Sequence, residues 1–273
     1  MELLTVSALG IAVVSAFRGT WSPCGVSMLS SITPLSEKGR GNRYWASVTW
    51  FILGAILGGA TLGALAALGA LIVSATGISA TPSAAAVLVA ALITVASDLG
   101  VGGFRLPANP RQVERTWLDR YRSWIYGLGF GWQLGVGVAT YVMSSSIYLM
   151  VVTAAATGEP LLAMGIVTLF GLLRGLAVLP AFRVNTPADL TALHRRIERF
   201  RPTSRAVAVI AQIGVLATAA TVLGGVVAGL VVAAVFLIVT WILHDGLEDP
   251  APRQRKQPAQ PATGLQPLSS RPG

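Results

Sequence analysis

Long runs of apolar residues, separated by short polar segments, dominate the pattern of this chain as far as residue 243. A helix that crosses the hydrocarbon core of a bilayer needs about 20 apolar residues, each rising about 1.5 Å. We therefore expect an all-α polytopic transmembrane bundle of six or seven spans. The predicted spans are residues 3–33, 45–74, 83–97, 124–156, 160–182 and 206–243.

The last apolar run, residues 206–243, contains 38 residues without a charge. As a single helix it would be about 57 Å long, nearly twice the thickness of the hydrocarbon core. Gly224 and Gly225 favour a bend near its centre, because glycine adopts backbone conformations that other residues avoid. We therefore expect two spans here, and seven in total.

Composition and charge agree with a membrane protein. Of the residues, 53% are hydrophobic and 11% are charged, whereas about a quarter are charged in a typical soluble domain. The formal net charge is +9, but the basic residues lie in loops beside the apolar runs, as in loops that face anionic lipid headgroups. The lipid bilayer, and not a nucleic acid, is the partner that this pattern indicates.

The basic residues also predict an orientation in the cell membrane. The first, third and fifth loops are rich in arginine or lysine, at residues 38–43, 105–122 and 183–205, whereas the second and fourth loops contain no basic residue. Under the positive-inside rule, the basic loops lie in the cytoplasm and the N-terminus lies outside.

Two of the basic loops contain amphipathic segments, residues 109–124 and 186–200. In the second of these, apolar residues recur at helical spacing between arginines. We expect either helices that lie along the membrane surface or ordinary loop helices packed on the bundle. The apolar residues of the second segment are Leu190, Leu193, Ile197 and Phe200.

The chain also contains a weak internal repeat. "SPCGVSMLSSI" at residues 22–32 resembles "GVATYVMSSSI" at residues 137–147, and four of the eleven positions are identical. The two copies lie in the first and fourth apolar runs, which cross the membrane in opposite directions. This arrangement predicts an inverted 3+3 repeat, in which broken helices meet near the membrane midplane and form a site.

The repeat suggests a division of the chain. The transmembrane domain is expected at residues 1–243, with repeat one at about 3–100, repeat two at about 124–223 and an extra span at about 226–243. Residues 244–273 are rich in proline and glutamine, and we expect them to form a disordered tail.

Helix-breaking and polar residues within an apolar run mark the candidate site. Irregular backbone is tolerated at membrane depth only where it lines a cavity or is buried in protein. Pro23 can kink the first helix and Pro34 can end it. The polar side chains either line a substrate pathway or permit close helix packing. They are Ser27, Ser30, Ser31 and Thr33 in the first copy and Thr140, Ser144, Ser145 and Ser146 in the second.

The "SPC" motif with its proline-ended polar segment, together with the "GLGFG" approach to the fourth run, resembles the CcdA/DsbD transmembrane thiol-disulfide family. The resemblance is specific around residues 22–35 and looser around residues 127–147. It implies an inverted-repeat membrane protein that passes electrons from thioredoxin across the membrane, for cytochrome c maturation or disulfide reduction. In the family, one cysteine in each repeat forms the redox pair.

This chain departs from the family at the second cysteine. Cys24 matches the first one, and Ala139 stands at the second position. Exchange between a dithiol and a disulfide requires a resolving thiol, so Cys24 is a candidate single redox thiol. It could pair with a thioredoxin-like or other thiol-bearing partner or a second copy, act as a thiol or metal contact in a transport pathway, or be a small buried side chain.

Arg174 is the clearest charge at membrane depth, and such a charge usually faces a cavity or a partner. A pair with Asp98 is one arrangement that the sequence allows. The sequence contains no Cys/His cluster and no nucleophile motif, so we predict neither a metal site nor a cofactor.

Three functions follow from these residues. The first is transmembrane thiol-redox transfer or cytochrome-type maturation with a partner thiol. The second is transport of a small solute or metal ion by a protein similar to the lysine-exporter superfamily. The third is non-catalytic assembly of another membrane complex.

Overall fold

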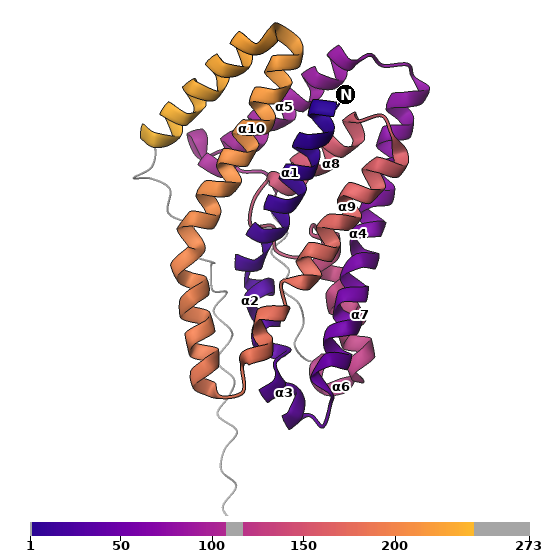
Figure 1. The fold of residues 1–273 in the computed structure, drawn as a ribbon, viewed down its shortest axis with the longest axis vertical. Helices are drawn as coiled ribbons and strands as arrows, with labels where there is room; N and C mark the ends of the chain where they lie inside the picture. Colours follow the sequence, from indigo (N-terminus) through magenta and orange to yellow (C-terminus); the bar gives the residue numbers. More distant parts are fainter. Residues whose placement is uncertain (1, 108–116, 243–273) are drawn as a thin grey trace, which may run out of the picture.

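The computed structural model describes residues 2–107 and 117–242, and these residues form helices without β-strands (Figure 1). The protein is thus an all-α polytopic bundle, as predicted. The first half contains α1 (Glu2–Arg18), η1 (Gly19–Trp21), α2 (Pro23–Ser31), α3 (Pro34–Gly39), α4 (Tyr44–Ala75), α5 (Ala80–Leu99) and η2 (Val101–Gly103). The second half contains α6 (Trp117–Arg120), α7 (Ser123–Val136), α8 (Ser146–Ala156), α9 (Pro160–Leu176), η3 (Leu179–Arg183) and α10 (Pro187–Ile242).

Five helical segments among these residues are long and apolar enough to cross a membrane. By contrast, α7 has 14 residues and α8 has 11, which correspond to only about 21 and 17 Å. They lie in one apolar run and are separated by residues 137–145. The predicted breaks in the first and fourth runs are therefore present, while the number of spans stays a prediction. The five segments are Glu2–Trp21, Tyr44–Ala75, Ala80–Leu99, Pro160–Arg183 and Pro187–Thr240.

Helix α10 bends where the sequence predicted a bend. Gly225 has φ +81° and ψ 175°, which interrupts the helix. In Figure 1, α10 rises along one side of the bundle, turns at its top and descends again. The 206–243 run is therefore two helical arms rather than one straight helix.

The amphipathic segment at residues 186–200 is not a separate surface helix, because it continues directly into the apolar part of α10. Pro202 lies inside this helix and removes one backbone donor. Two carbonyl groups near Pro202 also accept hydrogen bonds from side chains. Trp21 Nε1 donates to the carbonyl of Ile197 at 2.7 Å, and Ser204 Oγ donates to that of Arg201 at 2.7 Å. The other amphipathic segment, residues 109–124, lies largely outside the described residues.

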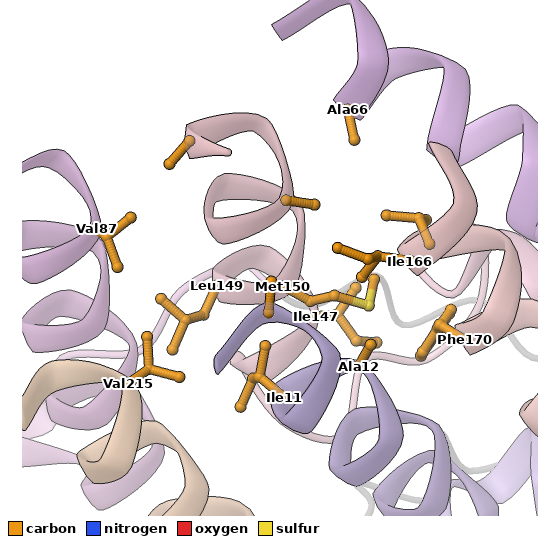
Figure 2. Close-up of a cluster of buried hydrophobic side chains, with 14 of the residues drawn as sticks. Ile11, Ala12, Ala66, Val87, Ile147, Leu149, Met150, Ile166, Phe170 and Val215 are labelled. Atoms are coloured by element: carbon orange, nitrogen blue, oxygen red, sulfur yellow. The ribbon is translucent and has the colours of Figure 1, made fainter. Parts of the chain in front are cut away.

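The main hydrophobic core joins helices from both halves of the chain (Figure 2). Ile11 of α1, Met150 of α8 and Phe170 of α9 are at most 1% exposed, and their side chains gather in one cluster (Figure 2). Val87 of α5 and Val215 of α10 complete one side of it. This core holds the irregular segments between α1 and α2 and between α7 and α8 inside the protein.

Glycines let α4 pack closely against its neighbours α7 and α9. A methyl group on Gly131 of α7 would overlap the carbonyl oxygen of Phe51, and one on Gly58 of α4 would overlap that of Trp132. Gly59 of α4 meets the backbone of Gly171 in α9 in the same way. Small residues that bring two backbones together are typical of helix pairs in membranes.

Both halves follow the same order: a broken helix, a long helix and a further helix. The repeat at about residues 3–100 and 124–223, with its inverted symmetry, stays a prediction. The predicted disordered tail, residues 244–273, lies outside the described residues.

Replacing Gly131 by alanine tests the packing of α4 against α7. We expect the melting temperature of the purified protein in detergent to fall by several degrees, because overpacking typically costs about 1–3 kcal/mol. Gly214→Ala is the control, because no atom lies within 4 Å of the added methyl group. Alanine favours a helix by about 1 kcal/mol relative to glycine, so the melting temperature of this variant should not fall. Equal melting temperatures for the Gly131 variant and the wild type would contradict this packing.

Candidate functional site

The break between α1 and α2 is built by a capped helix start. Ser22 Oγ accepts a hydrogen bond from the Gly25 backbone N–H at 3.1 Å and donates to the Gly19 carbonyl at 2.7 Å. Pro23 occupies the first turn of α2, where the missing N–H does no harm. The expectation that Pro23 kinks a continuous helix is therefore wrong, because Pro23 begins a new one.

Pro34 has the same role in the next element. Thr33 caps α3 by accepting from the Ser36 N–H at 3.0 Å, and Pro34 follows in the first turn. Helix α2 has already ended at Ser31. Both prolines thus start helices, and the polar residues before them supply the capping oxygen atoms.

The other hydroxyl groups of the first copy also serve nearby groups. Ser30 Oγ donates to the Val26 carbonyl at 2.8 Å and lies 2.7 Å from His194 Nε2 of α10, while Ser31 Oγ donates to the Ser27 carbonyl at 2.8 Å. These contacts fit the packing interpretation better than a substrate pathway.

The second broken segment, residues 137–145, surrounds a carboxylate instead. Asp98, at the end of α5, accepts hydrogen bonds from Ser144 Oγ at 2.5 Å, the Ser145 N–H at 2.8 Å and Gln212 Nε2 at 2.7 Å. Ser145 Oγ also donates to Ser97 Oγ at 2.9 Å. This Asp98 network connects α5, the start of α8 and α10.

The Asp98 network borders a polar pocket of about 110 Å³, which we call the Asp98 pocket. Arg18, Arg105 and Arg205 also line it, so its ionisable lining contains three arginines and one carboxylate. Arg205 Nη2 donates to the Asp98 carbonyl at 3.0 Å, and Arg18 Nη1 donates to Ser204 Oγ at 2.8 Å. A pocket with this excess of positive charge suits a small solute that carries an anionic group.

Two further residues of the second copy lie beside this pocket without lining it. Ser146 is fully buried, and its N–H donates to Ser144 Oγ at 3.2 Å. Thr140 is 1% exposed, and its Oγ1 has no hydrogen-bond partner. The unpartnered hydroxyl is the clearest polar group of this segment that local structure does not explain.

Arg174 lies away from the Asp98 pocket. Its side chain is 3% exposed, and its guanidinium carbon lies 5.7 Å from the centre of the Phe170 ring, one turn earlier in α9. A methyl group on Gly19 would overlap the guanidinium, so the chain passes directly over it there. Nε and Nη2 have no hydrogen-bond partner.

Arg174 and Gly25, the residue next to Cys24, line one small cavity. The Cys24 thiol forms no disulfide and is 1% exposed, in a buried cluster that also contains Met28 and Phe130. The Asp98–Arg174 pair that the sequence allows does not form between these described residues, because Asp98 bonds to Ser144 and Gln212 instead.

The two breaks approach one another inside the bundle. Arg18, from the end of α1, lines the Asp98 pocket together with Tyr141 and Ser144 of the second break. Tyr141 also packs against the buried cluster that contains Cys24. The structure therefore brings together the segments that the repeat singled out, although their polar residues divide between two places.

Sequence analysis missed a third buried polar group. Glu37 of α3 is fully buried and accepts from Ser47 Oγ and from the Tyr126 hydroxyl, both at 2.6 Å, while Arg40 Nη1 lies 3.0 Å from its other oxygen. Because Glu37 lies in a loop rich in charge, nothing in the local sequence separates it from a solvated residue. Its partners come from α4 and α7, so only the tertiary fold reveals it.

Comparison with known proteins links the chain to methylamine utilization proteins named MauF. It is 33% identical to the Paracoccus denitrificans protein over 192 residues and 33% identical to the Methylobacillus flagellatus protein over 178 residues. These matches cover 63% and 64% of this chain and 65% and 62% of those proteins. The Paracoccus versutus protein is 28% identical over 187 residues, which are 64% of this chain and 67% of that protein.

The chain thus spans slightly less than two thirds of the first two proteins. No protein-family model matches it, and no solved structure gives a significant match. The similarity supports a relationship to the MauF proteins, and it does not confirm the more specific resemblance to CcdA/DsbD.

Replacing Asp98 by alanine tests the Asp98 network. Three donors would lose their acceptor, and each buried donor left unpaired costs about 1–3 kcal/mol. We expect a melting temperature several degrees below that of the wild type in detergent. Asp98→Asn should lose less, because it keeps one acceptor oxygen. Glu159→Ala removes an exposed carboxylate from a loop and serves as the control. If Asp98→Ala and Glu159→Ala had the same melting temperature, the network would have no structural role.

Proposed function

We propose that this chain is a multi-pass membrane protein with an accessory role in methylamine utilization. The similarity to the MauF proteins is the observation that carries this proposal. The match covers 63% of the chain, which is more than half, so it includes the central residues and therefore the second broken helix. The helical bundle supports the membrane location.

We propose the Asp98 pocket as the working site of this role. It lies at the broken helix of the second half, where irregular backbone at membrane depth requires a cavity or buried surroundings. Its carboxylate is held by three donors, and Arg105, which follows η2, and Arg205 of α10 border the same space. This combination of a fixed carboxylate and surrounding cations suits the recognition or passage of a small polar solute better than the closely packed surroundings of Cys24 do.

Gene deletion in the host of this chain tests the proposal. We expect growth with methylamine as the sole nitrogen source to be lost, growth with ammonium to be kept, and the wild-type gene to restore the first. Unchanged growth of the deletion strain on methylamine would refute the proposed role.

The same strain tests the site separately from the role. Asp98→Asn should fail to restore growth although the variant reaches the membrane at the wild-type level, because the amide turns a donor toward Ser144 or Gln212. Glu159→Gln is the matched control and should restore growth fully. If Asp98→Asn also restored growth, the role would stand and the pocket would not be its site.

Thiol-redox transfer with a partner is a second candidate, and it is favoured by the cavity that Arg174 shares with Gly25, the residue next to Cys24. The Cys24 thiolate would attack one sulfur of a partner disulfide, form a mixed disulfide and release the other sulfur as a thiolate. Because the chain has no second cysteine, one thiol of a reduced partner dithiol would then attack the Cys24 sulfur and release the remaining sulfur of the first protein as a thiolate. The second thiol of the dithiol would displace Cys24, so that the dithiol leaves as a disulfide. The enclosed thiol must become accessible for this reaction.

Trapping in native membranes tests the second candidate. Acid quenching followed by thiol alkylation should preserve a mixed disulfide through Cys24 that disappears in Cys24→Ser and after reduction. We expect Cys24→Ser to lower growth on methylamine under this candidate. If no adducts formed and Cys24→Ser grew fully, this candidate would be refuted, and Cys24 would be only a small buried side chain.

A further inference from the structure

A large apolar groove lies on the side of the bundle between α1, α9 and the first part of α10. It has a volume of about 860 Å³, which is within the usual range of ligand sites, about 300–1,000 Å³. It is separate from the Asp98 pocket, although Arg18 borders both. We call it the lateral groove.

The amphipathic stripe of α10 forms one wall of the lateral groove. Leu193, Ile197, Phe200 and Val207 recur at intervals of three, four or seven residues and line it. Phe200 is 47% exposed, so this stripe does not pack tightly onto the bundle. The opposite wall contains Phe17 of α1, which is 63% exposed. Apolar side chains therefore face each other across an open space.

Arginines border one end of the groove. Arg183 ends η3, in the connection between α9 and α10, and Arg196 lies in the third turn of α10. Both side chains are exposed. The positive-inside rule predicts that this arginine-rich end faces the cytoplasm, where membranes present anionic lipid.

The wall formed by α10 is long enough to hold part of an acyl chain. Arg196 and Val207 are eleven positions apart in α10, which corresponds to about 16 Å along the helix.

We propose that the lateral groove is a binding site for an anionic phospholipid. Its acyl chains lie between Phe17, Ile197 and Phe200, and its phosphodiester contacts Arg183 and Arg196. Charge complementarity at the rim selects the anionic headgroup, since basic pockets between membrane helices bind such lipids. The apolar walls supply the remaining affinity.

Lipid titration of the purified full-length chain in detergent tests this proposal. Bound lipid is counted by native mass spectrometry with phosphatidylglycerol or phosphatidylcholine of identical acyl chains. We expect tighter binding of phosphatidylglycerol to the wild type. The double variant Arg183→Gln/Arg196→Gln should weaken its binding about thirtyfold, because each arginine near a lipid surface contributes about fivefold to the affinity.

The matched control is Arg195→Gln/Arg199→Gln, which removes the same charge from exposed positions of α10 that do not line the groove. It should bind phosphatidylglycerol nearly as well as the wild type. Equal weakening in both double variants would mean nonspecific attraction, and equal affinity for both lipids would exclude selection of an anionic headgroup. Either result overturns the proposal.

Thr203→Trp provides an independent test of the apolar part. Thr203 is an exposed residue of the groove wall, so a large side chain there fills the groove without disturbing the core. We expect loss of the selective phosphatidylglycerol site and an unchanged melting temperature without added lipid. Retained lipid binding would place the lipid elsewhere. If the wild type formed a dimer and Thr203→Trp did not, while lipid binding stayed unchanged, the groove would instead bind a second copy of this chain.

Discussion

The requirement that every backbone polar group at membrane depth find a partner inside the protein governs this structure. The first and fourth apolar runs are interrupted, and each interruption leaves donors and acceptors that lipid cannot satisfy. Ser22 and Thr33 cap new helices after the first interruption. Asp98 accepts the Ser145 N–H after the second. The polar residues within the apolar runs therefore serve first to bond backbone groups. Only polar residues that are not needed for these bonds are available to a ligand.

The two interruptions use their polar residues differently. In the first, the hydroxyl groups bond to carbonyls of their own helix, and the buried cation Arg174 lines a small cavity with Gly25, the residue next to Cys24. In the second, the hydroxyl groups turn toward a carboxylate from another helix and border a pocket. Although the repeat predicts similar roles for the two copies, the second has more of the features of a solute site.

The sequence predicted the helical bundle, the two interruptions and the bend at Gly225, because long apolar runs, prolines and paired glycines act locally. It did not predict that Pro23 and Pro34 start helices, since a proline at a helix end and one at a helix start look alike in sequence. The partners of Asp98 and Glu37 come from distant helices, so no local pattern reveals them. The stripe at residues 190–200 was recognised as amphipathic, but what it faces depends on α10 continuing past Pro202.

One turn of α10 lines both the lateral groove and the Asp98 pocket. Ser204 and Val207 line the lateral groove, while Arg205 and Ala208 line the Asp98 pocket from the same turn. A ligand that displaces this turn, in either the groove or the pocket, changes the free energy of ligand binding in the other. By thermodynamic linkage the effect is reciprocal: lipid composition would tune solute affinity to the same degree that solute tunes lipid affinity.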